Sequence, residues 1–247
     1  MGAATTTRRR YYNDTGKKYE TSRYADRHMD AYREFRNATL LSILQRDFGD
    51  RPIRILEVGC GTGLTLDFLR RSSDKYTVFG LDVSETMIRQ AAAKAEGESN
   101  GPRLSLGDAD KLPFGPGSFD VVLSTRFIHQ FSHETKQKLW NEFRRVARPD
   151  GMIITEFYAR PYHWLRYYLT GGAKGRTAEA YFSHFPTKRE VREIVGGAPE
   201  VHPLRLPGSR VLASALGERL AATATTSVAR ATGGVLMDEY FVVARNR

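Results

Sequence analysis

The chain has 247 residues, of which 40% are hydrophobic and 27% are charged, a balance typical of one soluble globular domain. No apolar run approaches the roughly 20 residues that span a bilayer, which excludes an integral membrane protein. The N-terminus lacks the apolar core of a secretory signal, so we expect a cytoplasmic location. The single cysteine, Cys60, excludes an internal disulfide and a multi-cysteine metal site, and we predict no bound metal.

The net charge of +10 is unevenly distributed along the chain. Residues 37–158 are balanced, with 16 basic and 16 acidic side chains, whereas the excess lies in residues 1–36 and 159–247. Basic flanks attract phosphates, carboxylates, anionic lipid surfaces or nucleic acid, and they also simply keep a protein soluble. The charge alone does not choose among these interpretations.

Residues 1–29 are polar and aromatic without clear periodicity, which indicates a mobile N-terminal arm or lid. An apolar stripe then predicts a helix over residues 30–48, and Ser84 is a typical cap for a helix that runs to about residue 95. The predicted strands span residues 53–58, 76–81, 103–106, 119–124, 152–158, 201–206 and 237–244. The other predicted helices span residues 64–71, 133–147, 161–169 and 187–195.

Strands that alternate with helices predict an α/β fold with a doubly wound, mostly parallel sheet covered on both faces. We expect a single domain over residues 1–247, in which residues 1–36 form an N-terminal helical lid and residues 52–158 form the core. Residues 159–200 would be an insertion on the acceptor side, and residues 201–247 would supply the C-terminal strands. The long connection at residues 207–234 is interpreted as a dimer contact, an acceptor lid or a lipid-facing surface.

The strongest local signal is a buried strand that runs directly into three glycines, Gly59, Gly61 and Gly63. Glycine allows the backbone to turn sharply and to approach a ligand closely at a helix N-terminus. The spacing is G-x-G-x-G and not the G-x-G-x-x-G of dinucleotide binders, which argues against a dehydrogenase. Cys60 lies in this crowded turn and is expected to be a small filler.

Four further elements follow the glycine loop in chain order. Asp82 ends the next predicted strand, 19 residues after Gly63, where a carboxylate can accept hydrogen bonds from a ribose diol. An acid, Asp108, then closes the third strand, with Asp110 as a neighbour. The apolar strand 118–124 and the helix–turn–strand segment 145–152 complete the series.

These five elements, in this order and spacing, resemble the class I S-adenosylmethionine-dependent methyltransferases over residues 52–158. The resemblance implies a seven-stranded Rossmann-like fold and S-adenosylmethionine as the cofactor. Residues 11–16 and 19–24 further resemble the N-terminal segment of the ubiquinone/menaquinone C-methyltransferase-like branch. No acceptor follows from this second resemblance alone.

Carried over by position, the resemblance implies contacts along the whole cofactor. Glu57 and the loop glycines Gly59, Gly61 and Gly63 would hold its methionine part, and Asp82 would hold the ribose. Val83 and Met87 would pack on the adenine ring, and Asp108 and Ala109 would contact its edge. Ser124 and Thr125 would line the pocket beneath the sulfonium, and Tyr19 and Arg23 would close over it. Other interpretations stay open: Glu57 as a salt-bridge or helix-dipole partner, and Asp108 or Asp110 as a turn cap.

Methyl transfer from a sulfonium is an in-line displacement, so the protein mainly positions the acceptor and excludes water. A base is needed only where the acceptor must lose a proton. His129, just beyond the fourth strand, is the best candidate because its intrinsic pKa is near neutrality, and Tyr19 is a second candidate for the chemistry. The alternative to catalysis for His129 is a structural role. His133 is expected to cap the following helix.

An aromatic and cationic cluster after the fifth strand is the candidate acceptor site. It could hold a flat or isoprenoid acceptor with a phosphate or carboxylate, form an amphipathic helix at a membrane interface, or be an ordinary core-facing helix. Its members are Tyr158, Arg160, Tyr162, His163, Trp164, Arg166, Tyr167 and Tyr168.

The leading hypothesis is therefore methyl transfer to a small-molecule or lipid-linked acceptor, with peripheral membrane contact and a homodimer as open possibilities. Methylation of RNA or protein is an alternative suggested by the basic charge, although no nucleic-acid-binding module is recognisable. A non-catalytic cofactor-binding scaffold is a third. The sequence does not distinguish C-, O- and N-methylation.

Overall fold

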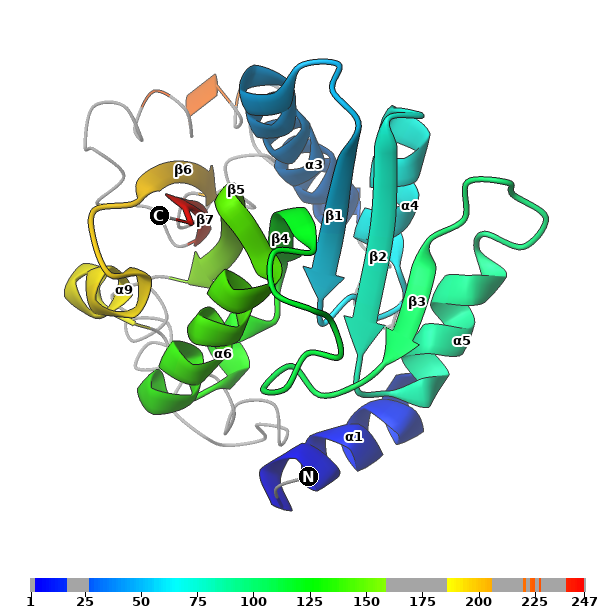
Figure 1. The fold of residues 1–247 in the computed structure, drawn as a ribbon. Helices are drawn as coiled ribbons and strands as arrows, with labels where there is room; N and C mark the ends of the chain where they lie inside the picture. Colours follow the sequence, from blue (N-terminus) through cyan, green and yellow to red (C-terminus); the bar gives the residue numbers. More distant parts are fainter. Residues whose placement is uncertain are drawn as a thin grey trace. The chain divides into compact units, whose positions relative to one another are not determined.

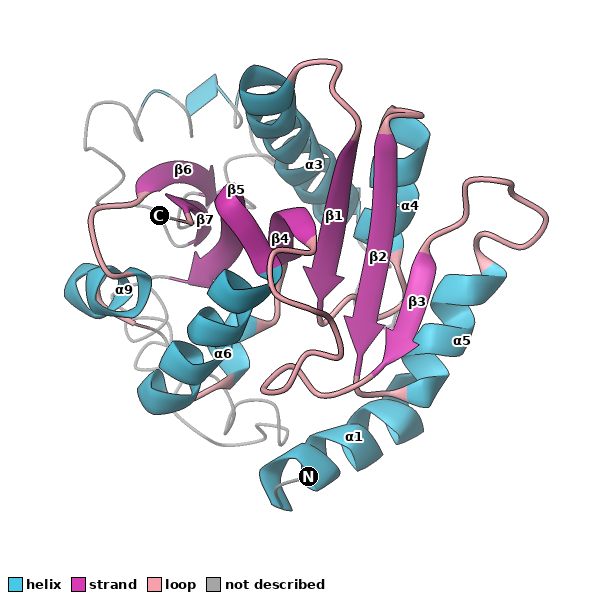
Figure 2. Cartoon of the chain, viewed as in Figure 1, coloured by secondary structure: helices cyan, strands magenta, loops and turns pink. Residues whose placement is uncertain are grey.

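The computed structural model describes residues 3–16, 27–158, 186–205, 220, 223, 224, 227 and 239–246. Its sheet has seven strands in the order β3-β2-β1-β4-β5-β7-β6 (Figures 1 and 2). The pairs β1–β2, β1–β4 and β2–β3 are parallel, and β6–β7 is antiparallel. This confirms the predicted α/β fold with a mostly parallel sheet. The strands are β1 Ile53–Val58, β2 Tyr76–Asp82, β3 Arg103–Leu106, β4 Phe119–Ser124, β5 Ala147–Tyr158, β6 Glu200–Arg205 and β7 Glu239–Arg245.

The chain divides into two compact units, and the first comprises residues 1–125, 141–153 and 245–247. It contains the helices α1 Ala3–Thr15, α3 Arg27–Phe48, α4 Leu64–Ser72 and α5 Glu85–Ala93. Helices α3, α4 and α5 lie on one face of strands β1–β3 (Figure 1). Ile55 pairs with Val78 and Val121 in register, and all three are buried, so β-branched side chains form the centre of this unit's core.

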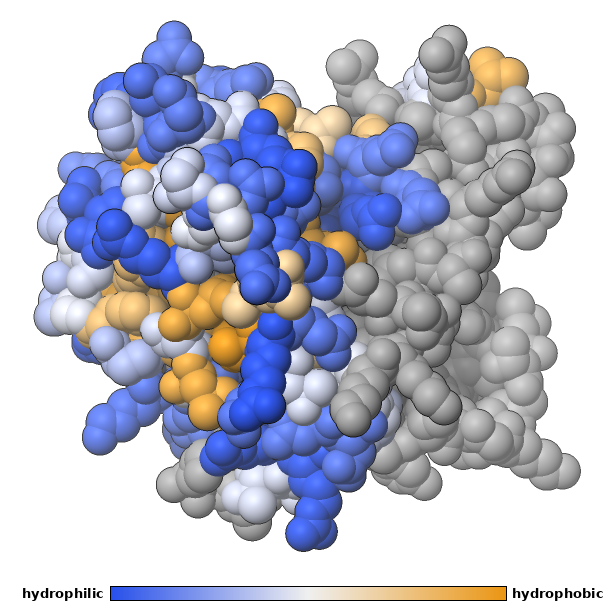
Figure 3. Space-filling view, turned by 90° about the vertical axis from the view of Figure 1, so that its right-hand side faces the viewer, coloured by the Kyte–Doolittle hydropathy of each residue, from blue (hydrophilic) through white to orange (hydrophobic). Residues whose placement is uncertain are grey.

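Residues 107–118, which join β3 to β4, form turns and no helix. Side chains and this loop therefore cover the opposite face of these strands. The rings of Phe79 and Phe119 meet edge to face at 5.1 Å, and Phe114 from the loop packs on Phe119 at 5.0 Å. The guanidinium groups of Arg54 and Arg103 lie over Phe79 at 5.1 and 5.3 Å. These cations keep their charge in water while their stems shield apolar rings. On the side that carries β3 and α5, the described surface is mostly hydrophilic, with a group of hydrophobic residues within it (Figure 3).

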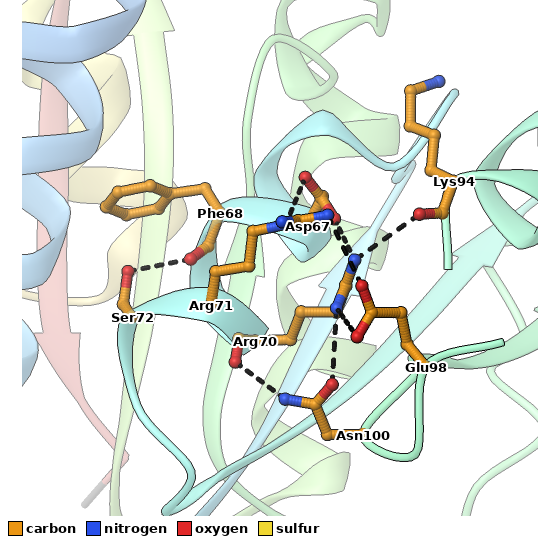
Figure 4. Close-up of polar contacts among 8 residues, drawn as sticks. All are labelled: Asp67, Phe68, Arg70, Arg71, Ser72, Lys94, Glu98 and Asn100. Carbon is orange, nitrogen blue, oxygen red and sulfur yellow. Dashed lines mark hydrogen bonds and ion pairs between the residues drawn. The ribbon is translucent and has the colours of Figure 1, made fainter. Parts of the chain in front are cut away.

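A buried arginine fastens α4 to the segment that joins α5 to β3 (Figure 4). Arg70 is 2% exposed, and its guanidinium forms ion pairs with Asp67 at 2.5 Å and Glu98 at 3.7 Å. It also donates to Asn100 Oδ1 at 3.3 Å and to the Lys94 carbonyl at 3.4 Å. Asn100 returns a hydrogen bond to the Arg70 carbonyl. The cluster thus holds this connection through contacts between residues up to 30 positions apart in the sequence.

The second unit comprises residues 126–140 and 154–244. Among its described residues are the 3-10 helix η2 Ile128–Gln130 and the helix α9 Lys188–Val195, while α6 His133–Val146, β5 and β7 run through both units. Helix α9 begins with a capping box in which Thr187 and Glu190 exchange side-chain-to-backbone hydrogen bonds. Across the described part of the chain, no helix is both long enough and apolar enough to cross a membrane.

Residues 3–15 form a regular helix, α1, within the N-terminal segment that we expected to be helical, although no periodicity in the sequence marked its position. Two details differ from the expectations drawn from the sequence. Strand β5 begins at Ala147, before the expected Met152, because Asp150 and Gly151 exchange backbone hydrogen bonds with Asn246. Helix α6 is capped by Ser132, whose Oγ accepts from the Thr135 N–H at 3.3 Å, so the expectation that His133 is the cap was wrong.

Candidate cofactor site and active site

The glycine turn after β1 takes the conformation that its sequence predicts. Gly59, Gly61 and Gly63 all have positive φ, at 74°, 52° and 79°, a region that side chains with a Cβ rarely adopt. Gly63 is the residue before α4, and a Cβ there would lie 2.8 Å from the Cβ of Ala91. At Gly61 the same atom would meet nothing within 4 Å. The turn therefore needs glycine for backbone shape at Gly61 and for helix contact as well at Gly63.

Asp82 ends β2 with its carboxylate directed at this turn. Its Oδ2 accepts the Gly61 N–H at 2.9 Å, and its Oδ1 accepts the Ser84 N–H at 2.9 Å. Burial raises the pKa of Asp82, and the backbone N–H groups of Ser84, Gly61 and Val83 oppose that shift. Each carboxylate oxygen has further lone-pair capacity. Asp82 can thus brace the glycine turn and still accept hydrogen bonds from a ligand.

Glu57 is a buried carboxyl group on β1, 1% exposed. The Thr125 hydroxyl, from the end of β4, donates to its Oε1 at 2.7 Å. Burial raises the pKa of Glu57 to about 7, against the opposing effects of Thr125 and of the buried Arg36. Thr65 also lies close enough to favour the carboxylate, but Oε2 makes no hydrogen bond of normal length and angle. A buried acceptor atom without a partner is costly, and a donor from a ligand or a water would satisfy it.

The residues predicted at the adenine end lie at the start of α5 and after β3. Val83 is half-buried and Met87 is buried, and the Met87 N–H donates to the Ser84 hydroxyl at 3.3 Å, which confirms Ser84 as the helix cap. Asp108 is half-buried and Ala109 is buried.

Asp110, the alternative to Asp108, is exposed. The Asp110 N–H reaches Asp108 Oδ1 at 3.5 Å, the outer limit of a hydrogen bond, so a weak turn-capping contact accompanies the more enclosed position of Asp108. Burial and the neighbouring Asp108 raise the pKa of Asp110.

The end of β4 contributes two hydroxyl groups that both face β1. Ser124 is fully buried, and its hydroxyl donates to the Val58 carbonyl at 3.2 Å, while Thr125 donates to Glu57. Ser124 therefore ties the two central strands together. Thr125 fixes the orientation of the Glu57 carboxyl, a role that sequence spacing could not reveal because 68 residues separate the two.

The second unit brings together two of the predicted acceptor-side residues. His129 lies in η2, and its ring meets that of Tyr158, at the end of β5, edge to face with 4.6 Å between centroids. Phe127 and Phe131 pack edge to face at 4.8 Å. Arg126, just after β4, has a φ of 52°, an unusual left-handed conformation for a side-chain-bearing residue. No sequence signal pointed to this conformation of Arg126.

Comparison with known proteins bears on the family of this fold and site. Residues 55–151 match a family model described as a methyltransferase domain. This stretch contains the glycine turn, Glu57, Asp82, Asp108 and the end of β4. Residues 55–151 form a class I methyltransferase domain. The seven-stranded α/β fold agrees with the expectation from the sequence, whereas the roles of the cofactor-side residues stay predictions. The matches do not distinguish the ubiquinone/menaquinone branch.

Named relatives of the methyltransferase domain act on different acceptors. A malonyl-[acyl-carrier protein] O-methyltransferase of Legionella pneumophila is 29% identical over 146 residues, which is 55% of this chain and 48% of the relative. A phthiotriol/phenolphthiotriol dimycocerosates methyltransferase of Mycobacterium ulcerans is 35% identical over 103 residues, 41% of this chain and 36% of the relative. The chain thus spans less than half the length of these curated relatives.

Among solved structures, the magnesium protoporphyrin IX methyltransferase of Synechocystis with bound SAH superposes on the methyltransferase domain and its flanks with a TM-score of 0.69. It is 18% identical, and the superposition covers 97% of this chain and 98% of that one. At this identity the likeness concerns the fold alone. It extends the agreement in fold well beyond residues 55–151.

Several predicted residues lie outside the part of the chain that the structure describes, and their roles stay predictions. Tyr19 and Arg23 precede α3, and the others follow β5. These others are Arg160, Tyr162, His163, Trp164, Arg166, Tyr167 and Tyr168. The connection 207–234 is described at only four positions.

Proposed function

We propose that the protein transfers a methyl group from S-adenosylmethionine to a small-molecule or lipid-linked acceptor. The observation that carries this proposal is the pairing of the glycine turn with two carboxyl groups, the half-buried Asp82 and the buried Glu57. Asp82 retains lone pairs beside the turn, and Glu57 Oε2 lacks a hydrogen bond. A ligand with a ribose diol and an ammonium group supplies donors of the kind that both carboxyl groups require.

In this proposal the residues of the cofactor site bind and orient, and the bound S-adenosylmethionine supplies an activated methyl group. Glu57 and the amides of the glycine turn would hold the amino-acid part, and Asp82 the ribose. Val83 and Met87 would contact the adenine ring, with Asp108 and Ala109 at its edge, and Thr125 would keep Glu57 in place. Catalysis then depends mainly on how precisely the acceptor is aligned and how well water is excluded.

His129 is the candidate base on the acceptor side. Its contact with Tyr158 fixes the imidazole against an aromatic ring, and a fixed imidazole can take a proton from a hydroxyl, an amine or an acidic carbon. Carboxylate acceptors need no base because they are already ionised near neutral pH. The two named relatives, one acting on a malonyl group and one on a lipid, support an anionic or lipid-like acceptor here.

A screen with a methyl-labelled donor tests the proposed activity. Purified protein and labelled S-adenosylmethionine are incubated with cell-extract fractions, and the label is followed into small molecules, lipids, RNA and protein. We expect label in the small-molecule or lipid fraction that depends on the intact Asp82 side chain. Label that enters only RNA or protein would contradict the proposed acceptor class, and no transfer to any fraction would contradict methyl transfer.

His129→Ala, compared with His133→Ala, tests the proposed base once an acceptor is known. His133 lies nearby in sequence on helix α6, where it contacts Gln137, so it controls for the loss of an imidazole. If His129 is the base, kcat falls on the order of a hundred-fold or more, while the KM for the donor is retained and His133→Ala stays active. Unchanged kcat with a neutral acceptor would remove His129 from the chemistry.

A further inference from the structure

Helix α1 lies beside the beginning of α5 (Figure 1), and specific polar contacts join the two. Asn13 Oδ1 accepts a hydrogen bond from the Ser84 hydroxyl at 2.7 Å, and the Asn13 carbonyl accepts from the Thr86 hydroxyl at 3.3 Å. Just beyond the helix, the Gln90 side chain donates to the Gly16 carbonyl at 2.9 Å. Three successive hydrogen bonds thus hold the end of α1 against α5.

The contact is also closely packed. Gly16 is buried, and a Cβ at this position would lie only 2.9 Å from Thr86 Cγ2. Any larger residue would push the two segments apart, because real Cβ atoms do not approach so closely. The hydrogen bonds and the packing together define one docked position for the end of α1.

The docked end of α1 connects directly to the ribose carboxylate of the proposed cofactor site. The Ser84 hydroxyl that donates to Asn13 also accepts from the Met87 N–H. The Ser84 N–H donates to Asp82 Oδ1 at 2.9 Å. Asn13 is therefore separated from Asp82 by one residue, Ser84, which contacts both. A shift of α1 changes the surroundings of the Ser84 cap and, through it, of Asp82.

We propose that the end of α1 is the outer wall of the adenosine site, with Asn13 as a positioning residue, and that docking of α1 and binding of the adenosine part stabilise each other. This inference rests on the proposed function. By thermodynamic linkage, the free energy by which docked α1 strengthens binding of the adenosine part equals the free energy by which that binding stabilises docked α1. Ligands without the methionine part should therefore feel the same coupling.

The experiment measures equilibrium binding of S-adenosylhomocysteine and of 5′-methylthioadenosine to the full chain. The variant Asn13→Ala is compared with the exposed control Asn141→Ala. We expect Asn13→Ala to weaken binding of both ligands by about three- to ten-fold, the range that loss of one hydrogen bond produces. The control should change affinity by less than about two-fold.

The outcomes separate the inference from the proposed function. If the wild-type protein binds neither ligand, the proposed function fails. If it binds both and the Asn13 variant binds them equally well, only the wall is refuted. A loss confined to S-adenosylhomocysteine would contradict the inference too, because it would place α1 at the methionine end.

Amide hydrogen exchange in the wild-type protein gives a second readout that does not depend on how the variants fold. Saturating 5′-methylthioadenosine should slow exchange in residues 6–16, and slow it less in Asn13→Ala. Exchange rates in this segment that do not change when the ligand binds would contradict the coupling. The exposed helix position Lys138, on α6 and outside both α1 and α5, provides the reference for changes unrelated to docking.

Discussion

Glu57→Gln replaces a buried ionisable carboxyl group with a neutral amide of nearly the same shape. In the folded protein the pKa of Glu57 is raised from the ordinary value of 4.5 to about 7, mainly by burial. Between these two pH values the folded chain keeps a proton that the unfolded chain has lost. Protonation therefore stabilises the fold, and stability must fall as pH rises from about 4.5 to about 7.

The size of the effect follows from the shift. Each pKa unit corresponds to about 1.4 kcal/mol, so ionising Glu57 in the folded protein costs about 3 kcal/mol at pH 8 relative to an exposed glutamate. Glutamine carries no such cost and can still accept from Thr125. We expect the free energy of unfolding of Glu57→Gln to rise by about 3 kcal/mol relative to that of the wild type as pH increases from about 4.5 to about 8. We also expect the variant to bind S-adenosylhomocysteine at least about ten-fold more weakly.

Urea unfolding of both proteins at a series of pH values measures this difference. Glu142→Gln is the control, because Arg145 lowers the pKa of Glu142. Stability from a lowered pKa is present above the ordinary value and is lost only as pH falls through it, so this control should follow the wild type from pH 5 to pH 8. Parallel curves for the wild type and Glu57→Gln over that range would refute the reasoning.

The remaining predictions concern the turn, the buried arginine and a helix cap. Gly63→Ala should cost about 2–4 kcal/mol in unfolding free energy, from backbone strain plus the clash with Ala91, whereas Gly61→Ala, with open space around it, should cost only about 1–2 kcal/mol. Arg70→Met should lower stability by about 2–5 kcal/mol in urea unfolding without changing S-adenosylhomocysteine affinity in calorimetry; weakened binding would contradict its purely structural role. Thr187→Ala should cost about 1 kcal/mol, and an unchanged urea midpoint would contradict the capping box.

The central strands could be predicted closely from the sequence because their signals are local. Strands β1, β3 and β4 begin and end at the predicted residues, and β2 extends one residue further, to Asp82. Each is a short apolar run bounded by glycine or polar residues, and burial on both faces leaves such a run few alternatives. Helices α4 and α5 followed from their apolar faces and, for α5, from the Ser84 cap.

The parts that could not be predicted depend on contacts distant in sequence. Helix α1 has no apolar stripe, and its polar contacts are with residues more than 70 positions away, such as the one between Asn13 and Ser84. The early start of β5 depends on Asn246, near the end of the chain. The choice of Ser132 over His133 as a cap was available locally, because serine is the stronger N-cap and the predicted helix begins at residue 133, as α6 does.

The same division holds for the candidate site. The positions of Glu57 and Asp82 beside the glycine turn followed from the motif series, whereas the hydrogen bond from Thr125 and the raised pKa of Glu57 depend on three-dimensional packing. Asp108 was favoured over Asp110 because the third strand was expected to end there; β3 ends at Leu106, and Asp108 is the more enclosed of the two acids. The cofactor roles of these residues stay predictions.

Calorimetric titration of S-adenosylhomocysteine into the wild-type chain and into Asp82→Asn tests the central claim most directly. The asparagine side chain can keep one backbone contact but loses the charge, so circular dichroism and thermal unfolding should first establish that the variant is folded. The account predicts binding at one site in the wild type and at least about ten-fold weaker binding in the variant, because hydrogen bonds to a charged acceptor are lost. Equal affinity in both proteins, or no binding to the wild type, would contradict it.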